Sequence, residues 1–181
     1  MYRLTQTCVS KEQLGHKWDF MHSGCLYYYA LTKNKLIDVI KIISRIDSVE
    51  LFLAGDFSND LLVKFNSELG ELVNISYLGE IFGEQKAVFF DSIDVLCLFS
   101  RNEGSPIVVA EAIESHTYCW LSTECNWRYS ELLDVGIVQD LFTEEEVLDS
   151  WALLKSLCSN YSPDRFKRCI ELCTKSVKHY E

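Results

Sequence analysis

The residues best suited to chemistry are two glutamates, Glu103 and Glu111, placed around the start of a predicted helix. Gly104 lets a ligand approach the backbone closely, Ser105 suits the N-cap and Pro106 suits the first helical position. The free N–H groups at such a helix start, together with the positive end of the helix dipole, favour an anion such as a pyrophosphate. The segment therefore predicts an anion site with Glu103 at its mouth.

A plainer interpretation fits either glutamate taken singly. An acidic residue just before a helix is stabilised by the helix dipole, and Glu111, about two turns further along, is of a type that is commonly solvated. The functional interpretation therefore depends on the combination and on the elements that position it.

Short apolar segments alternate with amphipathic segments along most of the chain. The apolar segments predict strands at 25–30, 50–55, 75–79, 94–100, 117–122 and 136–139. Helical spacing predicts helices at 35–46, 60–69, 84–92 and 106–115, and from residue 143 to the end with a break near Ser162 and Pro163. Strands that are apolar throughout are buried on both faces. The pattern predicts an α/β fold, a doubly wound parallel sheet with C-terminal helices.

Ligands of a doubly wound sheet bind beyond the carboxyl ends of its strands. The loops expected at that edge are 31–34, 55–59, 79–83, 99–105 and 123–128. Glu103 lies in the loop 99–105, and Glu111 lies in the predicted helix that follows this loop.

Length and charge limit the function classes. With 181 residues the chain is long enough for one domain with a full core. The formal net charge of −10 disfavours nucleic-acid binding, which needs clustered Lys and Arg. No apolar run is long enough to span a bilayer, and the polar first residues lack the apolar core of a signal peptide. We expect a cytoplasmic protein, either free or peripheral at the membrane through a partner.

The eight cysteines are expected to be reduced thiols, because the chain is not small and shows no secretory signal. Cys97 lies in an apolar run and is predicted to behave as a small hydrophobe. Cys169 and Cys173 lie one helical turn apart without a CxxC pair, which makes a poor zinc site. No metal and no cofactor are expected.

A family resemblance joins these observations. Glu103 and Glu111, with seven residues between them, form the E-x7-E motif of group 1 (family 4) glycosyltransferases of the GT-B fold, and SRNEGSPIVVAEAI resembles the usual form of that segment. LFLAGD, ISYLGEI, FFDSIDVLCLFS and KNKLIDVIKII resemble other segments of the family, in collinear order between residues 25 and 140. The resemblance implies the donor-binding C-terminal half of such an enzyme.

The resemblance also implies domain limits. It divides the chain into an N-terminal extension at 1–24, a nucleotide-sugar-binding Rossmann-like domain at 25–160 and a C-terminal helix at 161–181.

The family assigns a role to each matching residue. Glu111 is expected to accept hydrogen bonds from the ribose hydroxyls, and Glu103, as the catalytic residue, to hold hydroxyls of the donor sugar. The N–H groups of Gly104 and Ser105 are expected to bind the sugar or phosphate, with Arg101 also on the donor side. Lys35 is expected to neutralise the pyrophosphate, and Gly55 to line the nucleotide side. Such enzymes transfer a sugar from a UDP-, GDP- or ADP-sugar with retention and without an implied metal.

The sequence departs from the family in three ways. The acceptor-binding N-terminal half is expected to be absent. Tyr29 and Ala30 stand where the family has Gly-Arg, whose Arg pairs with the diphosphate. Third, the family has glycine or proline at the turn positions that are Phe99, His116 and Tyr118 in this chain. These bulky residues indicate relaxed selection or a remodelled rim. His116 as a catalyst competes with the commoner role of histidine as a helix cap.

Several functions remain open at this stage. A separate chain supplies the acceptor half, or the chain is an inactive remnant. Alternatively, the fold serves as an interaction module that docks a partner or self-associates through its cleft face. Aromatic residues in strands are more often part of the core, and those that could instead form such a face are Tyr27, Tyr28, Tyr29, Trp120 and Trp127. A GT-B sugar-nucleotide epimerase would share the fold and the ligand, without a positive sign in the sequence.

Overall fold

The computed structural model describes residues 23–27, 33–47, 49–55, 58–99, 107–125, 132, 134–139 and 143–177. The strands are β1 (Ser23–Tyr27), β2 (Glu50–Ala54), β3 (Ile75–Gly79), β4 (Val95–Leu98), β5 (Tyr118–Leu121) and β6 (Gly136–Val138). The helices are α1 (Lys33–Ser44), α2 (Asn59–Leu69), α3 (Glu84–Ser92), α4 (Ile107–Glu114), α6 (Glu144–Ser159) and α7 (Pro163–Val177), with a short 3-10 turn at Thr123–Cys125.

The six described strands form one sheet in the order β3-β2-β1-β4-β5-β6, and every described pair is parallel. From β1 in the middle of the sheet, successive strands are added outward to β3. The chain then returns to β4, beside β1, and adds β5 and β6 in the other direction. This arrangement confirms the predicted doubly wound α/β fold. Its topological switch point lies between β1 and β4.

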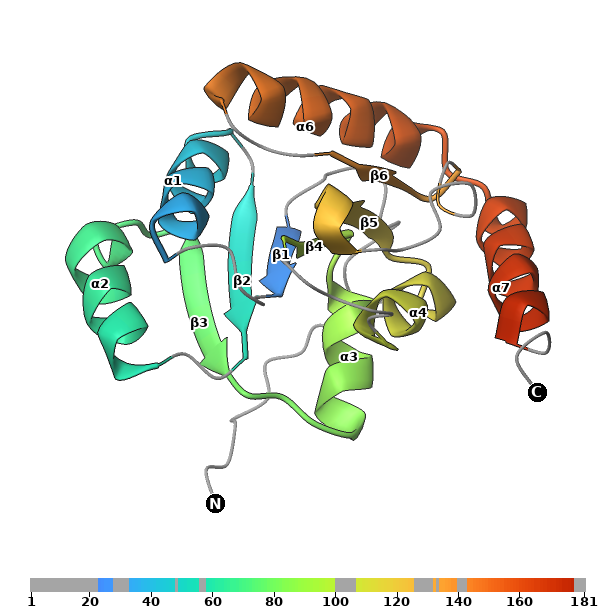
Figure 1. Cartoon of the computed structure of the whole chain (residues 1–181), viewed down its shortest axis with the longest axis horizontal. Coiled ribbons are helices and arrows are strands. Elements are labelled where there is room, and N and C mark those ends of the chain that lie inside the picture. The colour runs from blue at the N-terminus through green and yellow to red at the C-terminus, as the bar shows by residue number, and fades with distance from the viewer. Residues whose placement is uncertain are drawn as a thin grey trace.

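The two directions of winding place helices on both faces of the sheet, because parallel crossovers are right-handed. The connections through α1 and α2 run one way and those through α3 and α4 run the other, so the two pairs cover opposite faces. The C-terminal helices complete both layers, since α6 packs against α1 and α7 packs against α4 (Figure 1).

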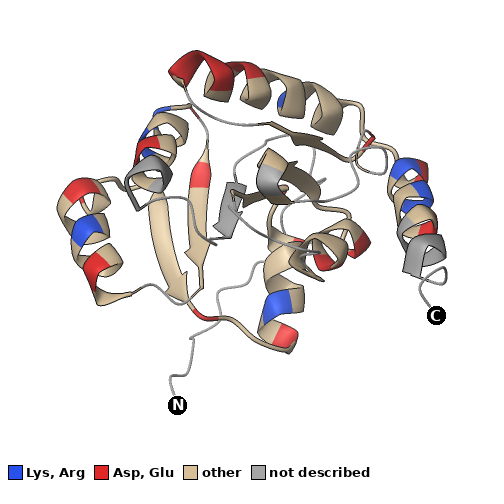
Figure 2. Cartoon of the chain, viewed as in Figure 1, with Lys and Arg blue, Asp and Glu red and all other residues tan. Residues whose placement is uncertain are grey.

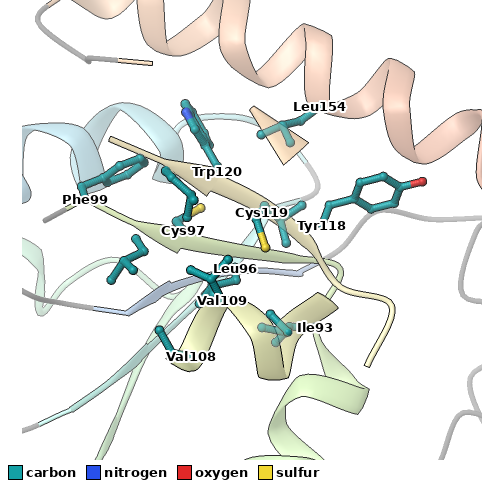
Figure 3. Close-up of a cluster of buried hydrophobic side chains, with 14 of the residues drawn as sticks. Ile93, Leu96, Cys97, Phe99, Val108, Val109, Tyr118, Cys119, Trp120 and Leu154 are labelled. Carbon is teal, nitrogen blue, oxygen red and sulfur yellow. The ribbon is translucent and has the colours of Figure 1, made fainter. Parts of the chain in front are cut away.

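The two central strands that follow the switch point form the middle of the core. All side chains of β4 and β5 are buried, as their continuous apolar sequences VLCL and YCWL require. Figure 3 shows side chains of this cluster on both faces of the two strands, with Trp120 and Leu154 of α6 on one side and Val108 and Val109 of α4 on the other. Burial raises the pKa of the Cys97 thiol, which therefore serves as a small apolar side chain.

The aromatic residues of the alternative docking face meet different outcomes here. Trp120 is fully buried, in agreement with the commoner place of strand aromatics in a core, and is therefore excluded from such a face. The Trp120 ring lies edge-to-face with Phe99 at a centroid separation of 5.4 Å. This contact gives Phe99, which stands where the family has a proline, a role in packing the core. Tyr27, Tyr28, Tyr29 and Trp127 have side chains outside the described residues.

The C-terminal helices begin and end where the local sequence favours it. Thr143 caps α6, and its side chain and that of Glu146 bond each other's backbone N–H groups in a capping box. Helix α6 ends at Ser159, and Pro163 is the first residue of α7, a position that tolerates its missing N–H. The predicted break near Ser162 and Pro163 is confirmed.

The junction between α4 and β5 explains two further family departures. His116 has a φ of 58°, the left-handed conformation that glycine adopts at the end of many helices. Its ring stacks on Phe166 with centroids 5.0 Å apart, and its Nδ1 lies 2.8 Å from the Tyr161 hydroxyl. Tyr118 packs edge-to-face on Phe166 and donates to the Leu157 carbonyl at 3.0 Å. Both residues join α4 and β5 to the C-terminal helices.

Replacing His116 by glycine tests whether these contacts outweigh the backbone strain. Relief of the left-handed conformation favours glycine by about 1–2 kcal/mol, and greater freedom in the unfolded chain removes about 0.5–1 kcal/mol of that gain. The lost ring contact and hydrogen bond cost about 1 kcal/mol each, and the lost apolar burial adds to this cost. We expect His116→Gly to lower the free energy of unfolding by about 1 kcal/mol in urea denaturation.

The matched control is Tyr161→Phe in both backgrounds. It should cost about 1 kcal/mol in the wild type and much less beside Gly at position 116. A His116→Gly chain more stable than the wild type would show that strain dominates this junction.

Candidate functional site

The carboxyl ends of the parallel strands gather at one edge of the sheet, and this edge holds the predicted site. The arrowheads of β2 and β3 point to the end where α3 begins (Figure 1). Helix α4 begins at the same edge because it follows β4, and β4 flanks the switch point. Glu111 is the fifth residue of α4, about 6 Å along the helix from its start.

The structure places only part of the predicted site. Glu111 and Gly55 are described, and Lys35 lies in the first turn of α1, with its side chain outside the described residues. Arg101, Glu103, Gly104 and Ser105 lie outside the described residues. Their predicted roles therefore remain predictions.

Glu111 has a charged partner that the sequence did not indicate. The Lys86 ammonium of α3 forms an ion pair with Oε2 of Glu111 on the neighbouring helix α4. Figure 2 shows the basic residue on α3 and the acidic residues on α4. Oε2 has no accessible surface and accepts no hydrogen bond of normal geometry from a described residue, so the contact is a pairing of charges.

Both members of this pair remain open to solvent elsewhere. The Lys86 side chain is 24% exposed and the Glu111 side chain 35%. Since Oε2 is covered, the exposed part of Glu111 lies on its other atoms, and Oε1 is the oxygen left for a ligand. A carboxylate with one covered oxygen keeps the other as a candidate acceptor of hydrogen bonds from hydroxyl groups.

Gly55 and Gly79 form the neighbouring part of the edge, at the ends of β2 and β3. The Gly55 N–H donates to the Gly79 carbonyl at 2.8 Å, and the Tyr77 hydroxyl donates to the Gly55 carbonyl at 2.8 Å. Gly55 has a φ of 131° and Gly79 a φ of 70°, which side chains rarely adopt. A Cβ at either position would meet no atom within 4 Å, so a ligand has room to approach the backbone.

Sequence reasoning did not single out Lys86, Phe82 or Ile107 at this edge. Phe82 lies between β3 and α3 with 66% of its surface exposed, and Ile107 at the start of α4 is 74% exposed. The predicted edge loop at 79–83 already included Phe82. Lys86 was harder to find, because only the packing of α3 on α4 brings it to Glu111.

Membrane-spanning helices and metal-binding clusters are both absent from the described residues. No described helix is long and apolar enough to cross a bilayer. No three His, Cys, Asp or Glu side chains gather within the described part of the chain in a way that would hold a metal ion.

The fold is similar to that of glycosyltransferases of known structure. Sucrose-phosphate synthase from Thermosynechococcus elongatus superposes with a TM-score of 0.66 at 15% identity, over 94% of this chain and 47% of that one. WaaG, a glycosyltransferase of lipopolysaccharide biosynthesis, gives a TM-score of 0.60 at 15% identity, over 89% of this chain and 44% of that one. The fold of this chain therefore matches about half of each of these GT-B glycosyltransferases.

A third similar structure is a single domain. The C-terminal domain of a group 1 family glycosyltransferase, LpcC from Francisella tularensis, matches with a TM-score of 0.60 at 15% identity, over 84% of this chain and 85% of that domain. The chain spans about half the length of the full-length glycosyltransferases that it resembles. The sequence matches no protein-family model and no curated protein.

The Lys86–Glu111 pair is expected to contribute little to stability. Both side chains keep solvent contact, and pairs of this kind contribute about 0.2–1 kcal/mol. A double-mutant cycle of Lys86→Met and Glu111→Ala in urea denaturation should give a coupling energy below about 1 kcal/mol that decreases as salt is added. A salt-independent coupling above about 2 kcal/mol would identify a structural pair and contradict an open site.

Proposed function

We propose that the chain is the donor-binding half of a retaining glycosyltransferase and holds a nucleotide-diphosphate sugar at the carboxyl edge of its sheet. The observation that carries the proposal is Glu111, which lies about one turn inside α4, next to the switch point of a GT-B sheet, with one carboxylate oxygen covered. The E-x7-E pattern of Glu103 and Glu111 and the similar fold support the same function. One similar structure, Anabaena HepE, is in complex with UDP and glucose.

Each side of the donor has a candidate partner. Glu111 accepts the ribose hydroxyls, and the open backbone at Gly55 lines the nucleotide side. In this proposal Arg101 binds on the donor side and Lys35 neutralises the diphosphate, whose bond to the anomeric carbon breaks when the sugar is transferred to an acceptor oxygen. Cations near the departing diphosphate stabilise the negative charge that develops on it.

The donor sugar lies at the segment between β4 and α4. Glu103 binds its hydroxyls, and the N–H groups of Gly104 and Ser105 bind the sugar or phosphate. These roles depend on the helix start, where free N–H groups and the dipole favour an anionic ligand.

A second domain completes the site in this proposal. The chain spans about half of the similar full-length glycosyltransferases, and the acceptor is held by a separate half, in another chain or in a longer polypeptide. The exposed Phe82 and Ile107 give the edge an apolar rim that a second domain would cover.

Calorimetric titration of the chain with UDP, GDP and ADP tests donor binding. We expect saturable binding of at least one nucleotide, and at least a tenfold loss, about 1.4 kcal/mol, in Glu111→Ala, because the ribose loses its acceptor. Glu114→Ala is the matched control: Glu114 is exposed at the end of the same helix, and its loss should leave the affinity within about twofold.

The outcomes separate the open functions. Absence of binding by the folded chain at millimolar concentrations of all three nucleotides would contradict the donor-domain function and favour a remnant or a docking module. Equal affinity in the wild type and Glu111→Ala would place the ligand away from α4.

The chain alone should bind the donor without turning it over. Incubation of the nucleotide sugar whose diphosphate binds best with the isolated chain should release nucleoside diphosphate at a rate no higher than the buffer control, because no acceptor is held against the donor. Steady release by the isolated chain, lost in Glu111→Ala, would contradict the requirement for a second domain.

A further inference from the structure

The Lys86–Glu111 pair joins two helices that arise from different strand connections. Helix α3 follows β3 and α4 follows β4, and the two pack side by side on one face of the sheet. Lys86 is the third residue of α3, in its first turn, and Glu111 is the fifth of α4, about one turn from the end of that helix at the carboxyl edge. The pair therefore sits where a ligand of this sheet binds.

The pair leaves the carboxylate with two different oxygens. Oε2 is covered and paired with the Lys86 ammonium, and the 35% of the Glu111 side chain that remains exposed lies on its other atoms. Each carboxylate oxygen has two acceptor sites. A ligand hydroxyl can therefore donate to Oε1 without displacing Lys86.

A glutamate on a helix surface is otherwise free to adopt many rotamers. Fixing such a long side chain costs up to about 1.5–2 kcal/mol of conformational entropy, which a ligand would have to overcome on binding. The ion pair restricts Glu111 before the ligand arrives, so that less of this cost falls on binding. The ammonium also offsets the carboxylate charge locally, in a chain whose net charge of −10 opposes anionic ligands.

We propose that Lys86 is a positioning residue that holds Glu111 ready to accept the two vicinal hydroxyls of a nucleotide ribose. The inference rests on the proposed function, because it assigns Glu111 to the ribose. In this role, Lys86 affects the recognition of an intact cis-diol. Recognition of the base and of the diphosphate does not depend on it.

Two other roles for Lys86 make different predictions. A lysine that only attracts the diphosphate would favour all nucleotides alike, whether or not their ribose carries hydroxyls. A lysine that occupies the ribose position would compete with the ligand, and its removal would tighten binding. The ratio of affinities for ligands with and without the diol separates these cases.

The experiment measures that ratio by calorimetry. The ligands are whichever of UDP, GDP and ADP binds the wild type best and its 2′,3′-dideoxy counterpart. The variants are Lys86→Met, which keeps the length of the stem, Lys86→Arg, which keeps the charge, and Glu111→Ala. Lys64→Met on α2 is the control: it removes one positive charge elsewhere and breaks a comparable pair with Glu68.

We expect the wild type to prefer the intact ribose by at least about tenfold, and Lys86→Met to reduce that preference by about fivefold. Lys86→Arg should retain most of it, and Lys64→Met should leave it unchanged. Lys86→Met should cause no further loss of preference in the Glu111→Ala background, because the two residues act through one carboxylate.

Each contrary result has a separate meaning. An unchanged ratio in Lys86→Met, with the wild type still sensitive to Glu111→Ala, overturns the role of Lys86 and leaves the donor function intact. Tighter binding of the intact nucleotide by Lys86→Met overturns it in favour of competition. If the wild type binds none of the three diphosphates, the proposed function itself fails and this inference fails with it.

Discussion

The parallel direction of the strands is the constraint on which the rest of the structure depends. Because the described strands all run the same way, their carboxyl ends share one edge, and each helix must cross the sheet to return the chain. The reversal of winding between β1 and β4 then separates the loops that leave these two strands. The two segments that the sequence predicts to bind the ligand, one before Lys35 and one before Glu111, follow β1 and β4.

The same constraint explains where His116 and Tyr118, two departures from the family pattern, lie. Helix α4 runs away from the carboxyl edge, so His116 and Tyr118 lie at its far end, against α6 and α7. Their rings fill the space between α4, β5 and the C-terminal helices, and burial raises the pKa of Tyr118 so that its hydroxyl remains a donor. These departures belong to packing at the end of the domain opposite the proposed site.

Periodicity was enough to predict most of this fold. Continuous apolar runs such as VLCL and YCWL located the buried strands, and helical spacing from residue 143 and the break near Ser162 and Pro163 located the last two helices, to within about two residues. The site was harder to predict from the sequence. Glu111 was identified from its motif, whereas Lys86 has no local signal, because its contact with Glu111 depends on tertiary packing of α3 on α4. Trp120 was left with two alternatives, the core or a docking face, and the packing of β5 decides for the core, since composition does not tell a buried aromatic from an exposed one.

The central claim, that a nucleoside diphosphate binds at the carboxyl edge beside Glu111, is tested most directly by mapping the amide resonances of the ¹⁵N-labelled chain during titration with UDP, GDP and ADP. The account predicts that the shifted amides gather at the carboxyl edge, around Gly55, Gly79 to Lys86 and the first turns of α4. Amides around His116 and the amino ends of the strands should remain unchanged. Shifts concentrated at that opposite end, or no shift at saturating nucleotide, would contradict it.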